Sequence, residues 1–174
     1  MAPVVLASVI LLTSLGGIIV YTDVRHRRIP NVCVLVTLVG GLLLHLFFGG
    51  PAALLTSVSG CGLAFGLMFV LHVLGGMGAG DVKFFAAVGS VIGFPLVLPA
   101  FFVTVLAGLA LAVFVMIRAG VVRQTLWRVL NIFGKTVPVV QALVPTCPAG
   151  PRHTIPYGAA IVAGGLASLF LFRP

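Results

Sequence analysis

The feature that most limits what this chain can fold into is a series of long apolar stretches with almost no charge inside them. A helix that crosses a bilayer needs about 20 apolar residues, with a range of roughly 17–25. We therefore predict an all-α, polytopic membrane protein with about six transmembrane helices. The predicted helices cover residues 3–21, 32–48, 52–74, a short segment that runs from Val82 to the break at Gly93-Phe94-Pro95, 96–117 and 155–172.

The scarcity of charge excludes several classes of protein. Apolar residues make up 61% of the chain and charged residues 7%, against about 45–50% and about 25% in soluble domains. Seven per cent is too little to cover a surface that faces water. This composition excludes a soluble globular protein, a disordered chain and a nucleic-acid-binding module. We expect a single membrane-embedded domain over residues 1–174, with no separate soluble domain.

The basic residues predict the orientation in the membrane. Nine of the ten Lys and Arg residues fall in the first, third and fifth connections between the predicted helices, and Arg173 is the exception. Connections that are rich in Lys and Arg stay in the cytoplasm. We therefore predict that these three connections are cytoplasmic and that both termini face outward from the inner (plasma) membrane.

The last cytoplasmic connection, residues 118–154, is long enough to hold structure of its own. Basic and amide side chains recur there at helical spacing, with apolar residues and Trp127 between them. This pattern is typical of a basic amphipathic helix on the inner membrane surface. The alternative is a solvated linker with a charged face.

The acidic residues carry most of the information about function. The chain has no Glu and two Asp, namely Asp23 and Asp81. Asp23 follows one predicted crossing and Asp81 follows three, so both lie at the cytoplasmic face. Taken singly, Asp23 could be a counter-ion for the arginines that follow it, and Asp81 could cap a helix N-terminus. A chain that places its two acids at one face favours a carboxylate pair.

A carboxylate pair without other acids is suited to one kind of chemistry. Two close carboxyl groups share a proton, so one can deprotonate water while the other polarises a peptide carbonyl. This is the chemistry of aspartic peptide hydrolysis. A metal site would need more ligands than two carboxylates, and phosphoryl transfer would need a phosphate cradle. We therefore expect no metal and no cofactor, and we expect the glycines before Asp81 to leave room for an extended substrate.

Three short motifs carry a resemblance to a known family. Asp23 is followed by Ile-Pro-Asn at 29–31, Asp81 lies in Gly-Ala-Gly-Asp-Val-Lys at 78–83, and Ile-Pro-Tyr-Gly occupies 155–158. In this order, over essentially the whole chain, they resemble the type IV prepilin peptidases, which are GxGD membrane aspartic proteases. The resemblance implies that Asp23 and Asp81 are catalytic. The supporting motif residues are Ile29, Pro30, Asn31, Gly78, Gly80, Lys83, Pro156 and Tyr157.

The resemblance also implies a substrate and partners. It implies cleavage of the leader from pilin-like precursors at the cytoplasmic face, with the precursor and the lipid bilayer as partners and no nucleic acid. Larger bacterial members carry a region with paired C-x-x-C motifs that is associated with methylating the new N-terminus. This chain has none, is similar to the short peptidases of tight-adherence (Flp-type) pilus systems, and is expected to cleave without methylating.

Two other functions remain open at this point. A presenilin-like intramembrane protease would place its aspartates deeper in the helices and carry a Pro-Ala-Leu segment late in the chain. A transporter or an assembly subunit of a secretion system would use the acids to bind cations or protons near the bilayer midplane. Both alternatives put the carboxylates further from the helix ends than this sequence does.

A few more residues lead to structural expectations. His45 and His72 lie in apolar helices and are expected to pack there, and His72 is close enough to the cytoplasmic end to hydrogen-bond near the site. Gly60, Gly62 and Gly66 form a glycine-rich face, which is typical of close helix packing in membranes.

Overall fold

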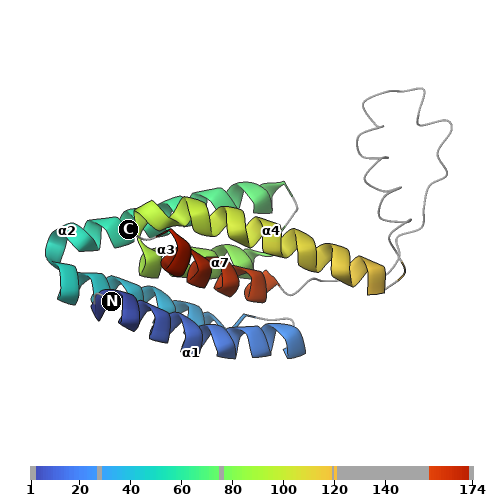
Figure 1. The fold of residues 1–174 in the computed structure, drawn as a ribbon, viewed down its shortest axis with the longest axis horizontal. Helices are drawn as coiled ribbons and strands as arrows, with labels where there is room; N and C mark the ends of the chain where they lie inside the picture. Colours follow the sequence, from blue (N-terminus) through green and yellow to red (C-terminus); the bar gives the residue numbers. More distant parts are fainter. Residues whose placement is uncertain (1–2, 27–28, 75–76, 119, 121–156, 173–174) are drawn as a thin grey trace, which may run out of the picture. The chain divides into compact units, whose positions relative to one another are not determined.

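The computed structural model describes residues 3–26, 29–74, 77–118, 120 and 157–172 (Figure 1). Each regular element in these ranges is a helix, which confirms the predicted all-α class. The predicted interfacial helix and Trp127 lie outside the described residues. The helices are α1 (Pro3–His26), α2 (Asn31–Val73), α3 (Ala79–Ile92), α4 (Phe94–Arg118) and α7 (Tyr157–Leu171).

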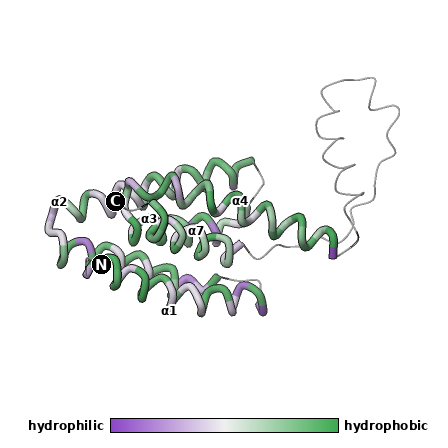
Figure 2. The backbone as a smooth tube through the Cα atoms, viewed as in Figure 1, coloured by the Kyte–Doolittle hydropathy of each residue, from purple (hydrophilic) through white to green (hydrophobic). Residues whose placement is uncertain are grey.

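The chain is a membrane protein by the length and composition of its helices. Three helices, α1, α2 and α4, are long and apolar enough to cross a bilayer. Figure 2 shows the hydrophobic colouring that runs along most of their length. The helices α3 and α7 are shorter, with 14 and 15 residues. The count of about six spans therefore stays a prediction.

A break in α2 divides it into two arms. A straight helix of its 43 residues would be about 65 Å long, roughly twice the thickness of the hydrocarbon core. Gly50 interrupts it with φ 70° and ψ −166°, a conformation that glycine adopts without strain, and Pro51 has no N–H to continue the ladder. Figure 1 shows α2 turning back on itself. The arms, 31–49 and 51–73, correspond to the two helices predicted at 32–48 and 52–74.

The short helix α3 forms the centre of the packed core. The sequence suggests a marginal membrane span here, but from Val82 to Ile92 every residue except Lys83 is buried. A helix that is apolar all round is one that other helices enclose. Its neighbours are α2, α7 and α1, and its aromatic residues Phe84 and Phe85 are fully buried.

Both arms of α2 approach α3 closely through glycine. A Cβ atom added at Gly41 would lie 2.8 Å from the backbone nitrogen of Val91. One added at Gly60 would lie 2.6 Å from the carbonyl oxygen of Gly89. Side chains cannot fit at either crossing, so glycine sets the distance between the helices.

Two polar side chains tie the same arms to the end of α3. The Ser57 hydroxyl donates to the carbonyl of Ser90 over 2.6 Å. The buried His45 ring donates from Nε2 to the carbonyl of Val91 over 3.0 Å. Carbonyls in the last turn of a helix lack partners within the helix, so these contacts satisfy groups that could not face lipid. The expectation that His45 is a packing residue is confirmed.

The contacts divide the chain into two compact units, residues 1–108 with 156–174, and residues 109–155. In the first unit α7 packs against α1 and α3. An added Cβ atom at Gly165 would lie 2.8 Å from the Val88 side chain. In the second unit the structure describes the end of α4, where the Arg118 guanidinium lies 5.1 Å from the centre of the Phe114 ring, and Gly120.

The glycine-rich face predicted for residues 52–74 is correct in part. Gly60 packs against α3, but Cβ atoms added at Gly62 or Gly66 would meet nothing within 4 Å. Both of these glycines are exposed. Their expected role in packing is therefore wrong within the described residues, because the helix turns them away from α3.

This difference gives a matched test of the packing. Gly60→Ala is expected to destabilise the protein by about 1–3 kcal/mol, because the added methyl group overpacks a contact with backbone atoms. Gly62→Ala, two residues away on the same arm, is expected to be neutral or stabilising by up to about 1 kcal/mol, because alanine favours the helix. Thermal unfolding of the detergent-purified variants measures both. Equal unfolding midpoints for the two variants would contradict the assigned packing.

Candidate active site

Asp23 lies in the last turn of α1 and is buried, with 8% of its surface exposed. The sequence predicts that the first helix ends at Tyr21, but α1 continues to His26, so the backbone of Asp23 is helical. Its Oδ2 atom accepts a hydrogen bond of 2.9 Å from the backbone N–H of Gly158. Within the described residues, the hydrogen-bond partner of this carboxylate is thus a backbone N–H of α7.

Gly158 occupies the first turn of α7 and is itself buried. The N–H groups of a first turn have no partner within their helix, so the Asp23 carboxylate satisfies one of them. A Cβ atom added at Gly158 would lie 2.8 Å from Oδ2 of Asp23. The hydrogen bond therefore depends on the absence of a side chain.

Asp81 is the third residue of α3 and accepts a hydrogen bond from its own helix start. Its Oδ2 atom accepts a bond of 3.3 Å from the backbone N–H of Gly78, which is half of a capping box. The alternative role as a helix cap is therefore present in the geometry. The preceding residues Gly78, Ala79 and Gly80 are all exposed, so the backbone beside the carboxylate is accessible.

The charge of Asp23 affects the ionisation of Asp81. Burial and the negative charge of Asp23 raise the pKa of Asp81 to about 6, and the hydrogen bond from Gly78 partly opposes this increase. A carboxyl with a pKa near 6 exchanges its proton readily near neutral pH. The structure thus holds one buried carboxyl group, at Asp23, and one carboxyl group with a raised pKa, at Asp81.

The other predicted motif residues lie in different surroundings. Ile29 packs over Gly80, where an added Cβ atom would lie 3.7 Å from the Ile29 side chain. Pro30 precedes the first turn of α2, and its carbonyl accepts a 3.3 Å bond from the N–H of Val34. The remaining motif residues are Asn31 and Lys83, which are exposed, Tyr157, which begins α7, and Pro156, which lies outside the described residues.

His72 holds the loop that leads to Asp81. Its Nδ1 atom donates a bond of 2.8 Å to the carbonyl of Met77, and its ring lies tilted against Phe69. Met77 directly precedes Gly78, so this bond fixes the backbone next to the capping N–H. The expectation that His72 hydrogen-bonds near the site is confirmed.

Tyr157 contacts α4 at a position without a side chain. A Cβ atom added at Gly108 would lie 2.9 Å from Cε1 of Tyr157. The ring therefore lies directly against the backbone of α4. This contact helps to fix the start of α7, which carries the N–H donor to Asp23.

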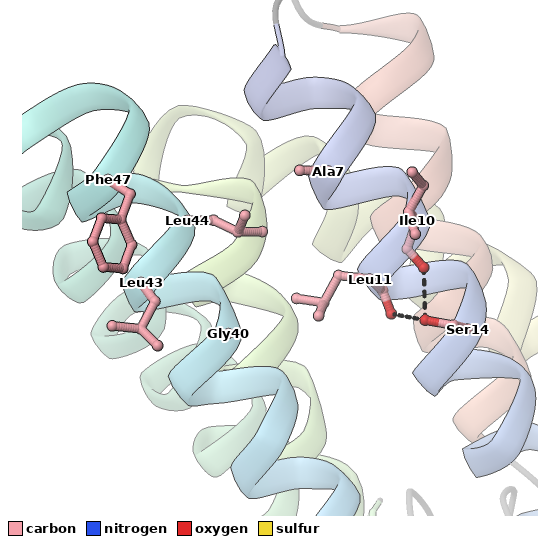
Figure 3. Close-up of a pocket in the computed structure, with 8 residues that line it drawn as sticks. All are labelled: Ala7, Ile10, Leu11, Ser14, Gly40, Leu43, Leu44 and Phe47. Atoms are coloured by element: carbon pink, nitrogen blue, oxygen red, sulfur yellow. Dashed lines mark hydrogen bonds between the residues drawn. The ribbon is translucent and has the colours of Figure 1, made fainter.

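An open groove lies between α1 and the first arm of α2, away from the aspartates. Its volume is about 450 Å³, and Figure 3 shows its lining residues, which include Leu11, Ser14 and Phe47. The Ser14 hydroxyl bonds to carbonyls of its own helix, so the lining offers little polarity. Ser14 precedes Asp23 by nine residues, about 13 Å along the helix, so the groove is separate from the candidate site.

Within the described residues, the arrangement offers two carboxyl groups in different surroundings. One carboxylate is buried and oriented by a peptide N–H, and the other carboxyl is partly exposed beside an accessible glycine backbone. In this part of the chain no cluster of three or more His, Cys, Asp or Glu side chains could hold a metal ion. Sequence reasoning found both aspartates and missed the N–H of Gly158 as a partner.

Comparison with known proteins gives a family and no individual relative. Residues 10–113 match the model of the Type IV leader peptidase family, which is well over half of the 174 residues. The matched range contains both Asp23 and Asp81, and α7 lies outside it. No curated protein and no solved structure matches the chain.

The raised pKa of Asp81 predicts a pH-dependent cost in stability. The folded state holds the proton up to a pH of about 6, above the ordinary value of 3.8. Between these values the folded chain binds more protons than the unfolded chain, so the free energy of unfolding falls as the pH rises. Asp81→Asn removes this loss and should stabilise the protein at neutral pH by about 1–2 kcal/mol, with allowance for partial exposure.

Thermal unfolding of the purified wild type and Asp81→Asn between about pH 4 and pH 8 measures this effect. The two proteins share every other titratable side chain, so the difference between their curves reports on Asp81. The two unfolding midpoints should converge near pH 4, separate as the pH rises to about 6, and stay a constant distance apart above it. Parallel curves over the whole range would show that Asp81 titrates normally.

Proposed function

Because the chain belongs to the Type IV leader peptidase family, we propose that it is a membrane aspartic endopeptidase that removes the leader from pilin-like precursors. The proposal makes Asp23 and Asp81 the catalytic pair. The single observation that supports it is that the negative charge of Asp23 raises the pKa of Asp81, as expected of two neighbouring carboxyl groups. Membership of the family implies peptidase activity, and the aspartic chemistry rests on this pair.

The proposed reaction uses one proton shared by the pair. The ionised carboxylate takes a proton from a water molecule, whose oxygen attacks the scissile carbonyl carbon. The protonated carboxyl gives its proton to the carbonyl oxygen, which forms a neutral tetrahedral intermediate. The C–N bond then breaks as the amine takes a proton from the pair, and a hydroxyl group of the intermediate returns a proton to the pair as it becomes the new carboxyl group.

The surroundings of the pair fit a peptide substrate. Backbone from Gly78 to Gly80 is exposed next to Asp81, so an extended chain can lie against it. Both aspartates lie at helix ends, in the last turn of α1 and the first turn of α3. A cation or proton carrier, and an intramembrane protease of the presenilin kind, would place them nearer the middle of the helices.

The proposal includes a topology. The site lies on the cytoplasmic side of the inner membrane and both termini face outward, as the distribution of basic residues indicates. Arg25 and His26 in the last turn of α1 and the exposed Lys83 flank the aspartates in the sequence. Positive charge around the pair supports a cytoplasmic position for it. The proposed activity is limited to cleavage, because the chain has no C-x-x-C pair.

The catalytic role of the pair predicts a severe loss of activity on substitution. Asp23→Asn and Asp81→Asn should each abolish cleavage of a pilin-like precursor, because asparagine keeps the size and hydrogen bonding of the side chain but cannot cycle a proton. Each loss should reach several orders of magnitude, and the double variant should be little worse than either single variant. The fraction of precursor cleaved in membranes with matched enzyme amounts measures the effect.

Chelators should leave the wild-type activity unchanged, because the proposed reaction uses no metal. Gly62→Ala is the control, since Gly62 is exposed on the second arm of α2, outside the motifs, and an added Cβ atom would meet nothing within 4 Å. It should cleave at close to the wild-type rate. Efficient cleavage by either aspartate variant would remove that aspartate from the catalytic pair.

The topology predicts which positions react with an impermeant thiol reagent. In a chain whose own cysteines are replaced, Ala52→Cys beside the α2 break should be labelled in intact cells, and Thr125→Cys should be protected. Ala52 is exposed and avoids the positive φ of Gly50. Labelling of Thr125→Cys after the cells are opened shows that it is reactive. The opposite pattern would place the proposed site outside the cytoplasm.

A further inference from the structure

We propose that Gly158 is the positioning residue for the catalytic carboxylate of Asp23, through its backbone N–H and through its lack of a side chain. The inference rests on the proposed function, since it assigns a partner to one member of the catalytic pair. It adds a residue far from both aspartates in the sequence, on a helix outside the matched family range. Gly158 touches the carboxylate, so it acts on the reaction through Asp23.

The first observation is the hydrogen bond itself. The Gly158 N–H donates to Oδ2 of Asp23 over 2.9 Å, and this bond is buried. A buried hydrogen bond to a charged group is stronger and more directional than an exposed one. It fixes Oδ2 of the carboxylate, and within the described residues no hydrogen bond holds the other oxygen, which can meet water or the shared proton.

The second observation is the lack of space for a side chain. A Cβ atom added at Gly158 would lie 2.8 Å from Oδ2 and 3.4 Å from Cγ of Asp23. Gly158 has a helical backbone, so the backbone conformation alone would accept alanine, which is the better helix former. The requirement for glycine at 158 therefore comes from the carboxylate and not from the helix.

The third observation is that Asp81 is held in a similar way. Its Oδ2 atom accepts the N–H of Gly78 over 3.3 Å, and a Cβ atom added at Gly78 would lie 3.1 Å from that same oxygen. Gly78 has an extended backbone with φ −76°, which other residues also adopt. Each aspartate thus accepts an N–H from a glycine, and a side chain added at that glycine would press on the accepting oxygen.

General helix packing does not explain Gly158 equally well. Gly164 and Gly165 of the same helix also lack space, but their added Cβ atoms would meet Thr104 and Val88 respectively. Those are packing contacts with α4 and α3. At Gly158 the three nearest atoms all belong to Asp23.

The test compares Gly158→Ala with glycine variants elsewhere, in the full-length, detergent-purified protein with a pilin-like precursor as substrate. Displacement of the carboxylate should lower kcat by about 10- to 100-fold. KM should stay within about twofold, because Gly158 contacts Asp23 rather than substrate. A rise in KM with kcat unchanged would overturn the positioning role.

Two controls separate positioning from packing. Gly17→Ala lies on the same helix as Asp23, and its added Cβ atom meets nothing within 4 Å, so its kcat should equal that of the wild type. Gly165→Ala presses on Val88 and should lower the melting temperature while its kcat stays within about threefold. A fall in kcat for Gly165→Ala as large as that for Gly158→Ala would overturn the inference.

A second measurement does not depend on activity. If the added methyl group conflicts with the Asp23 carboxylate, the fall in melting temperature caused by Gly158→Ala should shrink by about half or more in an Asp23→Ala background. An equal fall in both backgrounds would overturn the inference. This comparison holds even if Gly158→Ala is too unstable for kinetics, because the double variant removes the conflicting group.

Asp23→Asn distinguishes this inference from the proposed function. If Asp23→Asn is inactive and Gly158→Ala has a normal kcat, the positioning role is overturned and the peptidase assignment stands. If Asp23→Asn cleaves normally, the catalytic pair itself is overturned, and the role of Gly158 with it.

Discussion

The close contact between α3 and the two arms of α2 determines the positions of the other parts of the first unit. Lipid gives no hydrophobic driving force between helices, so helices associate where small residues let their backbones meet. Gly41 on one arm and Gly60 on the other provide these contacts. The break at Gly50 folds the arms towards each other. With α3 held between them, its first turn and Asp81 lie at the same end of the bundle as the last turn of α1 and the start of α7.

The partners of the two carboxylates suit a pair that must share a proton. Within the described residues, each aspartate accepts a hydrogen bond from a glycine N–H. A basic side chain in direct contact would strongly favour the ionised form of its aspartate. A peptide N–H orients the carboxylate with a smaller electrostatic effect. The pKa of Asp81 therefore remains sensitive to burial and to the charge of Asp23, which raise it to about 6.

Much of this organisation could be predicted from the sequence, because long apolar runs and helix breaks are local signals. The arms of α2 and the two aspartates follow from such signals. The central position of α3 does not, because the second arm of α2 buries Ser57, Gly60 and Ala64 and exposes larger apolar residues such as Phe65. In a membrane protein, apolar residues face the lipid as readily as they face the core. Hydrophobicity alone therefore could not show that Gly60 packs against α3 while Gly62 is exposed. The bond between Asp23 and Gly158 joins positions 135 residues apart, a distance over which spacing carries no signal.

The shortness of α3 follows from its place in the core. Its 14 residues extend about 21 Å, less than the roughly 30 Å of hydrocarbon that a spanning helix must cross. A helix enclosed by others does not need to match the bilayer, because its ends meet protein and water rather than lipid. Its first turn carries Asp81, which is partly exposed, while Asp23 in the last turn of α1 is buried. A carboxyl at such a position is desolvated enough to hold a proton and open enough to receive a peptide, and a full-length spanning helix would lose one of these two properties.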